Sequence, residues 1–162
     1  MLGILYSRKG ISTVMMPMIL LIMLSFASYS IDLGRAFILK HELQAACDAA
    51  AIAGTSMYVV EFAENPDGSI DLSSEIVKII EESANAEANR IFKENFNKKN
   101  LGELGVKTIY GDDLNEGTGE VVNFTTYKYY VTAEIPYILA RVFLGLGPTQ
   151  TVSLSSKATI RQ

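Results

Sequence analysis

The sequence predicts an α+β fold: a long N-terminal helix crosses a membrane and continues into a small head, where one further helix packs on an antiparallel sheet. Three observations predict it: an uncharged apolar run, a helical apolar pattern that continues beyond it, and alternating residues near the C-terminus. We therefore divide the chain into a cytoplasmic basic N-terminus at 1–10, a transmembrane helix at 11–31, a stem at 32–60 that extends the same helix, and an exported head at 61–162.

The transmembrane segment has 21 residues without a charged side chain and is flanked by charge on both sides. As an α-helix it rises about 31 Å, close to the hydrocarbon thickness of a bilayer. The residues that define the anchor are Arg8, Lys9, Ile11, Pro17 and Ile31. We favour an uncleaved anchor over a secretory signal peptide, because the apolar run exceeds about 15 residues and no small-residue cleavage site follows it.

Charge is distributed unequally on the two sides of this segment. Arg8 and Lys9 precede it without an acidic residue, whereas 12 basic and 18 acidic residues follow it, a net charge of −6. The positive-inside rule then places the N-terminus in the cytoplasm and the C-terminal head outside the membrane. An acidic head without a basic patch argues against nucleic-acid binding. Cys47 is the only cysteine, which excludes an intramolecular disulfide.

The stem continues the helix beyond the membrane. Apolar residues recur every three or four positions from Leu33 to Met57, which predicts one helix from about Ile11 to about Val60. Its alanine-rich part, residues 45–54, reflects either helix propensity alone or a smooth surface for the chain's own sheet or a neighbouring copy. Asp32 and Arg35 are expected to pair on one helical face, as an interfacial anchor or as a register between subunits.

The first half of the head is predicted to contain a turn and a helix. Residues 64–68 combine Pro66 and Gly68 in a turn that reverses the chain. A helix capped by Ser73 or Ser74 is expected to run to about Lys99, with an apolar stripe on one face.

The second half of the head is predicted to be mainly strands. Candidates are 106–110, 121–135 and 151–160, and a change in apolar parity predicts a bulge or a junction of two strands near Thr126. Between the last two lies an apolar segment, 136–145, which is expected to form a short helix or turn. That segment either closes the end of the sheet or lies on the membrane surface.

Taken together, several segments resemble the TadE/TadG-like proteins of tight-adherence (Flp) pilus assembly. The chain has a basic-Gly start ending at Gly10, an early Pro17, an IDLGR sequence at 31–35, and LQAACDAAA at 43–51, similar to the family's LQNAADAAA segment. The terminal region 131–158 also fits. The family motif and its helix packing involve Asp32, Gly34, Arg35, Leu43, Ala46, Cys47, Ala50 and Ala53.

The resemblance implies a non-enzymatic, pilin-like or pseudopilin-like subunit that contacts membrane lipid and carries its head on the bacterial cell surface. Its Ala-rich helix would pack with pilus or pilus-assembly subunits, without a cofactor or a small-molecule substrate. A candidate prepilin-type processing site lies between Gly10 and Ile11. Cleavage there would place Met15 at the fifth mature position, where such pilins have Glu. An uncleaved or minor subunit is therefore favoured over a major pilin.

Catalytic and metal-binding patterns are weak. His41 is the only histidine, and with Cys47 it falls short of the three or four ligands of a zinc site. The acidic loop at 111–120 lacks EF-hand spacing and is expected to be solvated. We predict no enzyme. The alternative function is a stand-alone membrane-tethered binding or sensor domain, with an aromatic patch formed by Tyr127, Tyr129, Tyr130 and Tyr137.

Overall fold

The computed structural model describes residues 8–64, 67–109 and 117–161, and for residues 8–14, 63 and 72–75 the backbone alone. Its elements in chain order are α1 (Arg8–Thr55), β1 (Tyr58–Glu64), β2 (Ile70–Ile79), α2 (Glu81–Lys98), β3 (Lys107–Thr108), β4 (Thr118–Asn123), β5 (Thr126–Pro136), α3 (Ala140–Leu144) and β6 (Thr149–Thr159). The predicted α+β class is confirmed.

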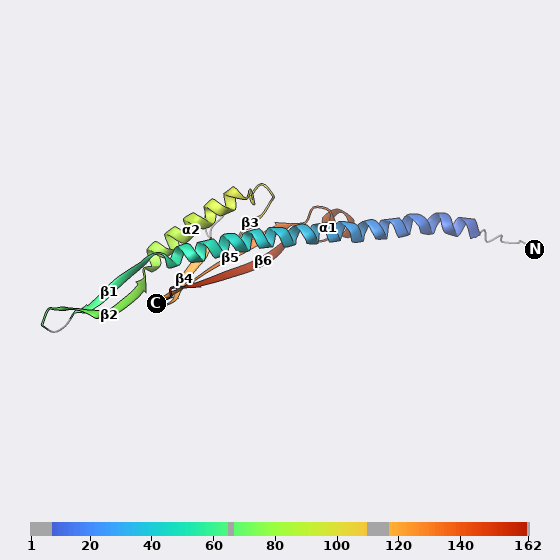
Figure 1. Cartoon of the computed structure of the whole chain (residues 1–162). Helices are drawn as coiled ribbons and strands as arrows, with labels where there is room; N and C mark the ends of the chain where they lie inside the picture. Colours follow the sequence, from blue (N-terminus) through green and yellow to red (C-terminus); the bar gives the residue numbers. More distant parts are fainter. Residues whose placement is uncertain (1–7, 65–66, 110–116, 162) are drawn as a thin grey trace, which may run out of the picture.

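Helix α1 is the longest element, and the β1–β2 hairpin extends beyond its C-terminal end (Figure 1). Its N-terminal turns extend beyond the other elements as a bare helix, α3 lies beside its middle, and its C-terminal half packs against the rest of the chain. Continuity through the predicted membrane boundary is confirmed. The helix ends at Thr55 rather than near Val60, because the segment from Tyr58 onward, rich in aromatic and β-branched residues, forms a strand instead.

Strand β5 is the centre of a four-stranded antiparallel sheet. Strand β6 pairs along its entire length, from Thr126 opposite Thr159 to Pro136 opposite Thr149. Strands β3 and β4 pair with different parts of β5 and therefore share its other edge. The junction predicted near Thr126 is confirmed, since β4 ends at Asn123 and β5 begins at Thr126.

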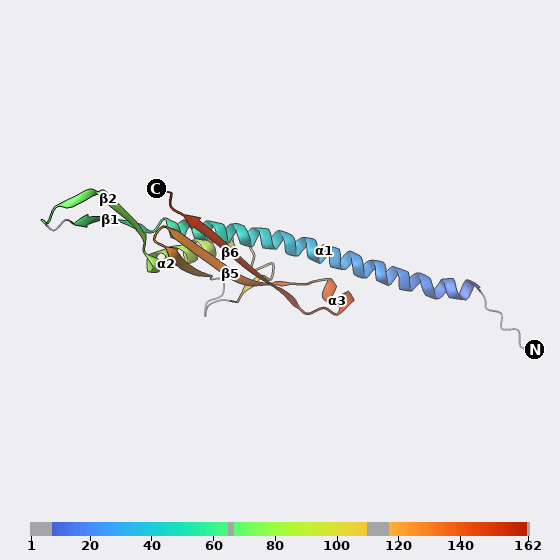
Figure 2. The same ribbon diagram turned by 90° about the horizontal axis from the view of Figure 1, so that it is seen from below.

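Helices α1 and α2 cover one face of this sheet, as Figures 1 and 2 show together. Alternate residues of β5 are buried there, as period-two alternation requires. Four residues on one face of α2 meet them, as the apolar stripe predicted. The buried set is Ala84, Ala88, Phe92 and Phe96 of α2, and Tyr127, Tyr129, Val131, Ala133 and Ile135 of β5. The core is therefore a single layer between two helices and a sheet.

The helix predicted from Ser73 or Ser74 is wrong at its start. Residues 70–79 form β2, which pairs antiparallel with β1 in a separate two-stranded hairpin. Of the turn predicted at 64–68, Asn65 and Pro66 lie outside the described residues. The antiparallel pairing of Glu64 with Ile70 shows that the chain reverses between them, with Gly68 at φ +80° and the Asp67 carboxylate accepting from the Ser69 N–H. Helix α2 begins at Glu81. The negative charges of Glu81 and Glu82 in its first turn stabilise the positive end of the helix dipole.

Candidate functional site

The alanine-rich face of α1 packs against the chain's own head. Leu43, Ala46, Cys47 and Ala50 have 0–1% of their surface exposed, and this half of α1 contacts α2, β5 and β6. Ala53 is half-buried. Of the two interpretations left open for this segment, the structure therefore supports a packing surface, and the surface is used within one chain.

Cys47 lies in the middle of that interface. Its Sγ donates to the Tyr129 carbonyl at 3.4 Å. Burial, with a smaller contribution from the Asp48 charge, raises the pKa of the thiol to about 12. Cys47 thus serves as a small buried residue of the interface, and a thiol that ionises only at such alkaline pH is a poor nucleophile.

Asp32 does not pair with Arg35 in the way that their spacing suggested. Its Oδ2 accepts from three consecutive backbone N–H groups, those of Ile138 at 3.1 Å, Leu139 at 2.8 Å and Ala140 at 2.6 Å. These groups lie at the start of α3, where the first helical N–H groups lack partners within the helix. Asp32 is only 4% exposed, so its carboxylate holds α3 to α1 at a buried position.

Arg35 makes the second contact between the stem and this end of the head. Its guanidinium donates to the Leu104 carbonyl at 2.6 Å and to the Pro136 carbonyl at 3.4 Å. Asp32 and Arg35 thus each bind backbone atoms of the head. Their partners lie 69 to 108 positions further along the chain, so no local pattern could have revealed them.

The opposite face of α1 has no partner among the described residues. At about 100° per residue, Gly34, Ile38, Ala45 and Ile52 lie together on the side away from Ala46 and Ala50. Ile38 is 62% exposed and Ile52 is 65% exposed. A Cβ added at Gly34 would meet no atom within 4 Å. This outer face, defined by those four residues, is the surface that a second protein could reach.

The predicted anchor residues all lie in α1, the one helix of the described chain that is long and apolar enough to cross a membrane. Met15 to Leu24 are exposed there, and Pro17 lies inside the helix without ending it. Gly10 and Ile11, the candidate processing site, have helical backbone in its first turns.

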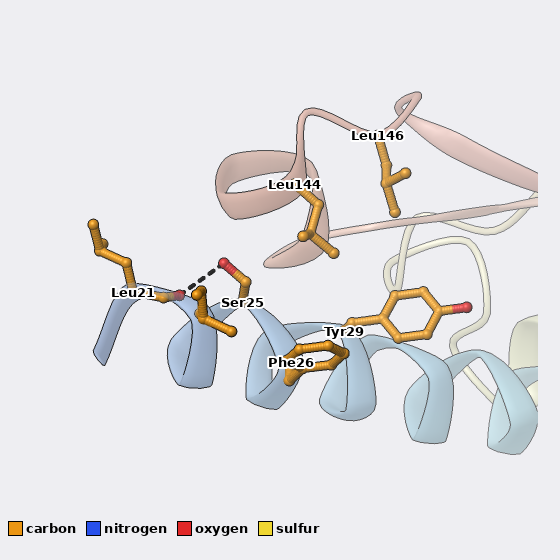
Figure 3. A pocket seen from close by; sticks show the side chains of 7 residues that line it. Leu21, Ser25, Phe26, Tyr29, Leu144 and Leu146 are labelled. Carbon is orange, nitrogen blue, oxygen red and sulfur yellow. Dashed lines mark hydrogen bonds between the residues drawn. The ribbon is translucent and has the colours of Figure 1, made fainter. Parts of the chain in front are cut away.

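An apolar groove separates α1 from α3 and the loop after it (Figure 3). It has a volume of about 550 Å³. Its lining residues are Leu21, Ile22, Ser25, Phe26 and Tyr29 of α1, with Leu144 and Leu146 opposite. Leu144 and Leu146 point across the gap towards α1. The Ser25 hydroxyl donates a hydrogen bond to the Leu21 carbonyl at 2.9 Å. Sequence patterns did not predict this groove, because its two walls are more than 100 residues apart.

The aromatic patch considered for a binding domain does not exist on the sheet surface. Tyr127 and Tyr129 are fully buried, and their hydroxyls donate to Asn85 and Asn89 of α2. Tyr130 lies on the opposite face of β5, where Lys128 sits 5.5 Å from its ring centre. The four tyrosines therefore do not form one surface.

The other candidate chemical groups are separate from each other. His41 is exposed on α1 and packs edge-on against the Phe37 ring. Among the side chains that the structure describes, no three His, Cys, Asp or Glu residues gather as metal ligands. Of the acidic loop, 111–116 lies outside the described residues, and Glu120 forms an ion pair with Lys128 at 3.4 Å.

Comparison with protein families identifies the long helix. Residues 10–57 match the family described as Putative Flp pilus-assembly TadE/G-like. The matched segment coincides almost entirely with α1 and ends before β1 begins, so the resemblance is confirmed over residues 10–57, and residues 58–162 lie outside the match. Neither the curated proteins nor the solved structures contain a match to this chain.

Proposed function

We propose that this chain is a membrane-anchored, non-enzymatic subunit of a Tad/Flp-type pilus assembly apparatus, of the minor-pilin or pseudopilin-like kind. The observation on which this rests is that the family segment, 10–57, coincides with a helix whose first half is apolar and exposed and whose second half is held by a head. Such a helix suits a subunit that stands in a membrane and presents a folded head above it.

The proposed topology is a single pass with the N-terminus in the cytoplasm. Arg8 and Lys9 precede the apolar run, and the chain beyond it is acidic. Asp32 and Arg35 then lie at the outer boundary of the membrane, where their contacts hold the lower end of the head.

Packing with other pilus or assembly subunits is proposed to use the outer face of α1. The face around Ala46 and Ala50 is covered by the chain's own head, so it is unavailable to another protein. The outer face combines Gly34 and Ala45, which permit close approach of a second helix, with exposed Ile38 and Ile52. No nucleic acid, cofactor or small-molecule substrate forms part of the proposal.

Site-specific photo-crosslinking in cells tests this proposal. A photoreactive amino acid at Ile38 or Ile52 is expected to capture other pilus-assembly proteins or a second copy of this chain. The same amino acid at Lys157, exposed on β6, is the matched control and should capture far less. Equal labelling at all three positions, or none at Ile38 and Ile52, would count against a packing role. The tethered-binder alternative predicts the latter result.

The subunit is further proposed to remain uncleaved at Gly10, since Met15 stands where a processed pilin has a carboxylate. The intact mass of the membrane-extracted protein checks this directly: a mass lacking residues 1–10 would contradict it.

A further inference from the structure

The segment from Ile138 to Gly147, which contains α3, has the amino-acid composition of a segment that contacts a membrane. A segment exposed to water on a soluble domain would carry more polar residues. Between Glu134 and Lys157 the only charged residue is Arg141. Several apolar side chains of the segment are exposed. They are Ile138, Val142, Phe143, Leu144 and Leu146, with Val142 at 74%. Side chains of this kind in water would cost free energy in proportion to their apolar area.

The position of this segment along α1 is informative. Leu144 and Leu146 lie opposite residues 21–29 of α1, inside the uncharged run. From Lys9 to Leu21 the helix rises only about 18 Å, whereas the hydrocarbon core is about 30 Å thick. The bare part of α1 is therefore too short to cross the bilayer alone. If Lys9 marks the inner boundary, the tip of the 138–147 segment lies within the outer leaflet.

On the same scale, the polar contacts of Asp32 fall at the outer edge of the hydrocarbon core. Asp32 is about 34 Å from Lys9 along the helix, which is at the outer edge of the hydrocarbon. It holds the N–H groups at the start of α3, and the segment descends from there towards Leu21. Arg141 is exposed, and its long side chain can extend to the phosphate level while its stem stays in the apolar region.

We propose that the 138–147 segment inserts into the outer leaflet and that the groove between it and α1 holds an acyl chain of a phospholipid, with Arg141 contacting the phosphate. This rests on the membrane anchoring proposed above. The groove walls are almost entirely apolar and the proton of the Ser25 hydroxyl is already donated to the Leu21 carbonyl, which favours an apolar occupant. A volume of about 550 Å³ is the size of a small-ligand pocket, which suits one flexible acyl chain.

Depth measurement tests the insertion. An environment-sensitive fluorophore is attached to Val142→Cys in the full chain, held in phosphatidylcholine–phosphatidylglycerol nanodiscs, and quenched by lipids with nitroxides at known depths. Reference sites are Leu20→Cys in the apolar run and Ile76→Cys on the β1–β2 hairpin. Cys47 can stay, since its buried thiol resists labelling.

We expect shallow-nitroxide lipid to quench Val142→Cys several-fold more than Ile76→Cys, and deep-nitroxide lipid to quench Leu20→Cys. If Val142→Cys behaves like Ile76→Cys while Leu20→Cys is quenched, the insertion is refuted and the anchoring stands. If Leu20→Cys is not quenched either, the anchoring itself fails.

Photoactivatable phospholipid, with a diazirine on its acyl chain, tests the occupant. Crosslinks are expected on peptides spanning 21–29 and 144–146. Ser25→Phe should fill the groove and lower their yield several-fold. Ser30→Phe is the matched control, because Ser30 has the same hydroxyl-to-carbonyl bond on α1 but does not line the groove. Equal yields in the two variants, or crosslinks to a second copy in place of lipid, would overturn the proposal.

Discussion

At the scale of single residues, one carboxylate joins the stem to the membrane-proximal end of the head. Asp32 accepts from three backbone N–H groups at the start of α3. Because those partners are backbone atoms, as are the Arg35 partners, the two contacts require no particular side chains in the head. A stem with this motif can therefore hold heads of different sequence.

Replacing Asp32 with alanine should release α3. Three N–H groups would lose their acceptor in a partly buried site, at a cost of about 1–3 kcal/mol. Hydrogen exchange of the full chain in nanodiscs should show faster exchange at Leu139 and Ala140. Asp48→Ala on the exposed side of the same helix is the control and should leave both amides protected. Unchanged protection in Asp32→Ala would contradict the role assigned to the carboxylate.

Two glycines of α1 should respond in opposite ways to alanine. A Cβ at Gly54 would overlap the Tyr127 ring, whereas at Gly34 it meets nothing within 4 Å. Gly54→Ala should therefore lower the free energy of unfolding by about 1–3 kcal/mol through overpacking. Gly34→Ala should raise it by up to about 1 kcal/mol through helix propensity. Chemical denaturation followed by circular dichroism measures both, and similar effects of the two substitutions would contradict the packing described for Gly54.

Alkaline pH should destabilise the head partly through Cys47. Its folded pKa is raised to about 12 from 9.0, so the unfolded thiol loses its proton first as pH rises. The stabilisation is present below pH 9 and is lost between about pH 9 and pH 12. At pH 10 the loss is on the order of 1 kcal/mol.

Thermal unfolding of the wild type and Cys47→Ala at pH 8 and pH 10 checks this, since the alanine variant should lose less stability over that interval. Burial also raises the pKa of Tyr127, which contributes the same sign to both proteins and cancels in the comparison. A larger alkaline loss in Cys47→Ala would refute the assignment.

At the scale of elements, the β1–β2 hairpin is the part least connected to the core. It projects beyond the head at the end away from the N-terminus (Figure 1), and backbone bonds at its base, from Ile79 to Phe124 and from Ile80 to Met57, attach it to the rest. Its strands contact chiefly each other. Exposed Phe62 and Ile76 give it an apolar surface above the head.

Replacing residues 61–76 with Asn-Gly should therefore leave the head folded. Val60 and Val77 face each other across the hairpin, and Asn-Gly forms the tight turn that such a pair accepts. We expect the free energy of unfolding to change by less than about 1 kcal/mol. Phe92→Ala, which removes a fully buried ring, is the positive control and should cost about 3–5 kcal/mol. A loss of similar size in the shortened hairpin would show that it supports the core.

Features that depend on residues close together in the sequence could be predicted, whereas features that depend on residues far apart in the sequence could not. The apolar run, the alternation of β5 and β6 and the buried stripe of α2 arise from local periodicity, so they were predictable. Residues 70–79 were not, because serines followed by Ile76, Ile79 and Ile80 also fit a helix, and pairing with β1 decides the outcome. The role of Asp32 and the groove at Leu21 to Tyr29 depend on contacts over more than 100 residues.

At the scale of the whole molecule, α1 is both anchor and scaffold. One face of its upper half is covered by the head and the other, with Ile38 and Ile52, is open. Towards the N-terminus, beyond the 138–147 segment, no other described element lies beside α1 (Figure 2). This arrangement supports a subunit that stands in the membrane, carries its head close to the lipid surface and offers one helical face to a neighbour.

The proposed role of this chain is in Flp pilus assembly. It is tested most directly by counting surface filaments by electron microscopy in cells that lack the protein and in the same cells complemented with it. We expect filaments to be absent or no longer retained on the surface without the protein, and to return with the wild-type chain. Normal numbers of intact filaments in the deletion strain would contradict the claim.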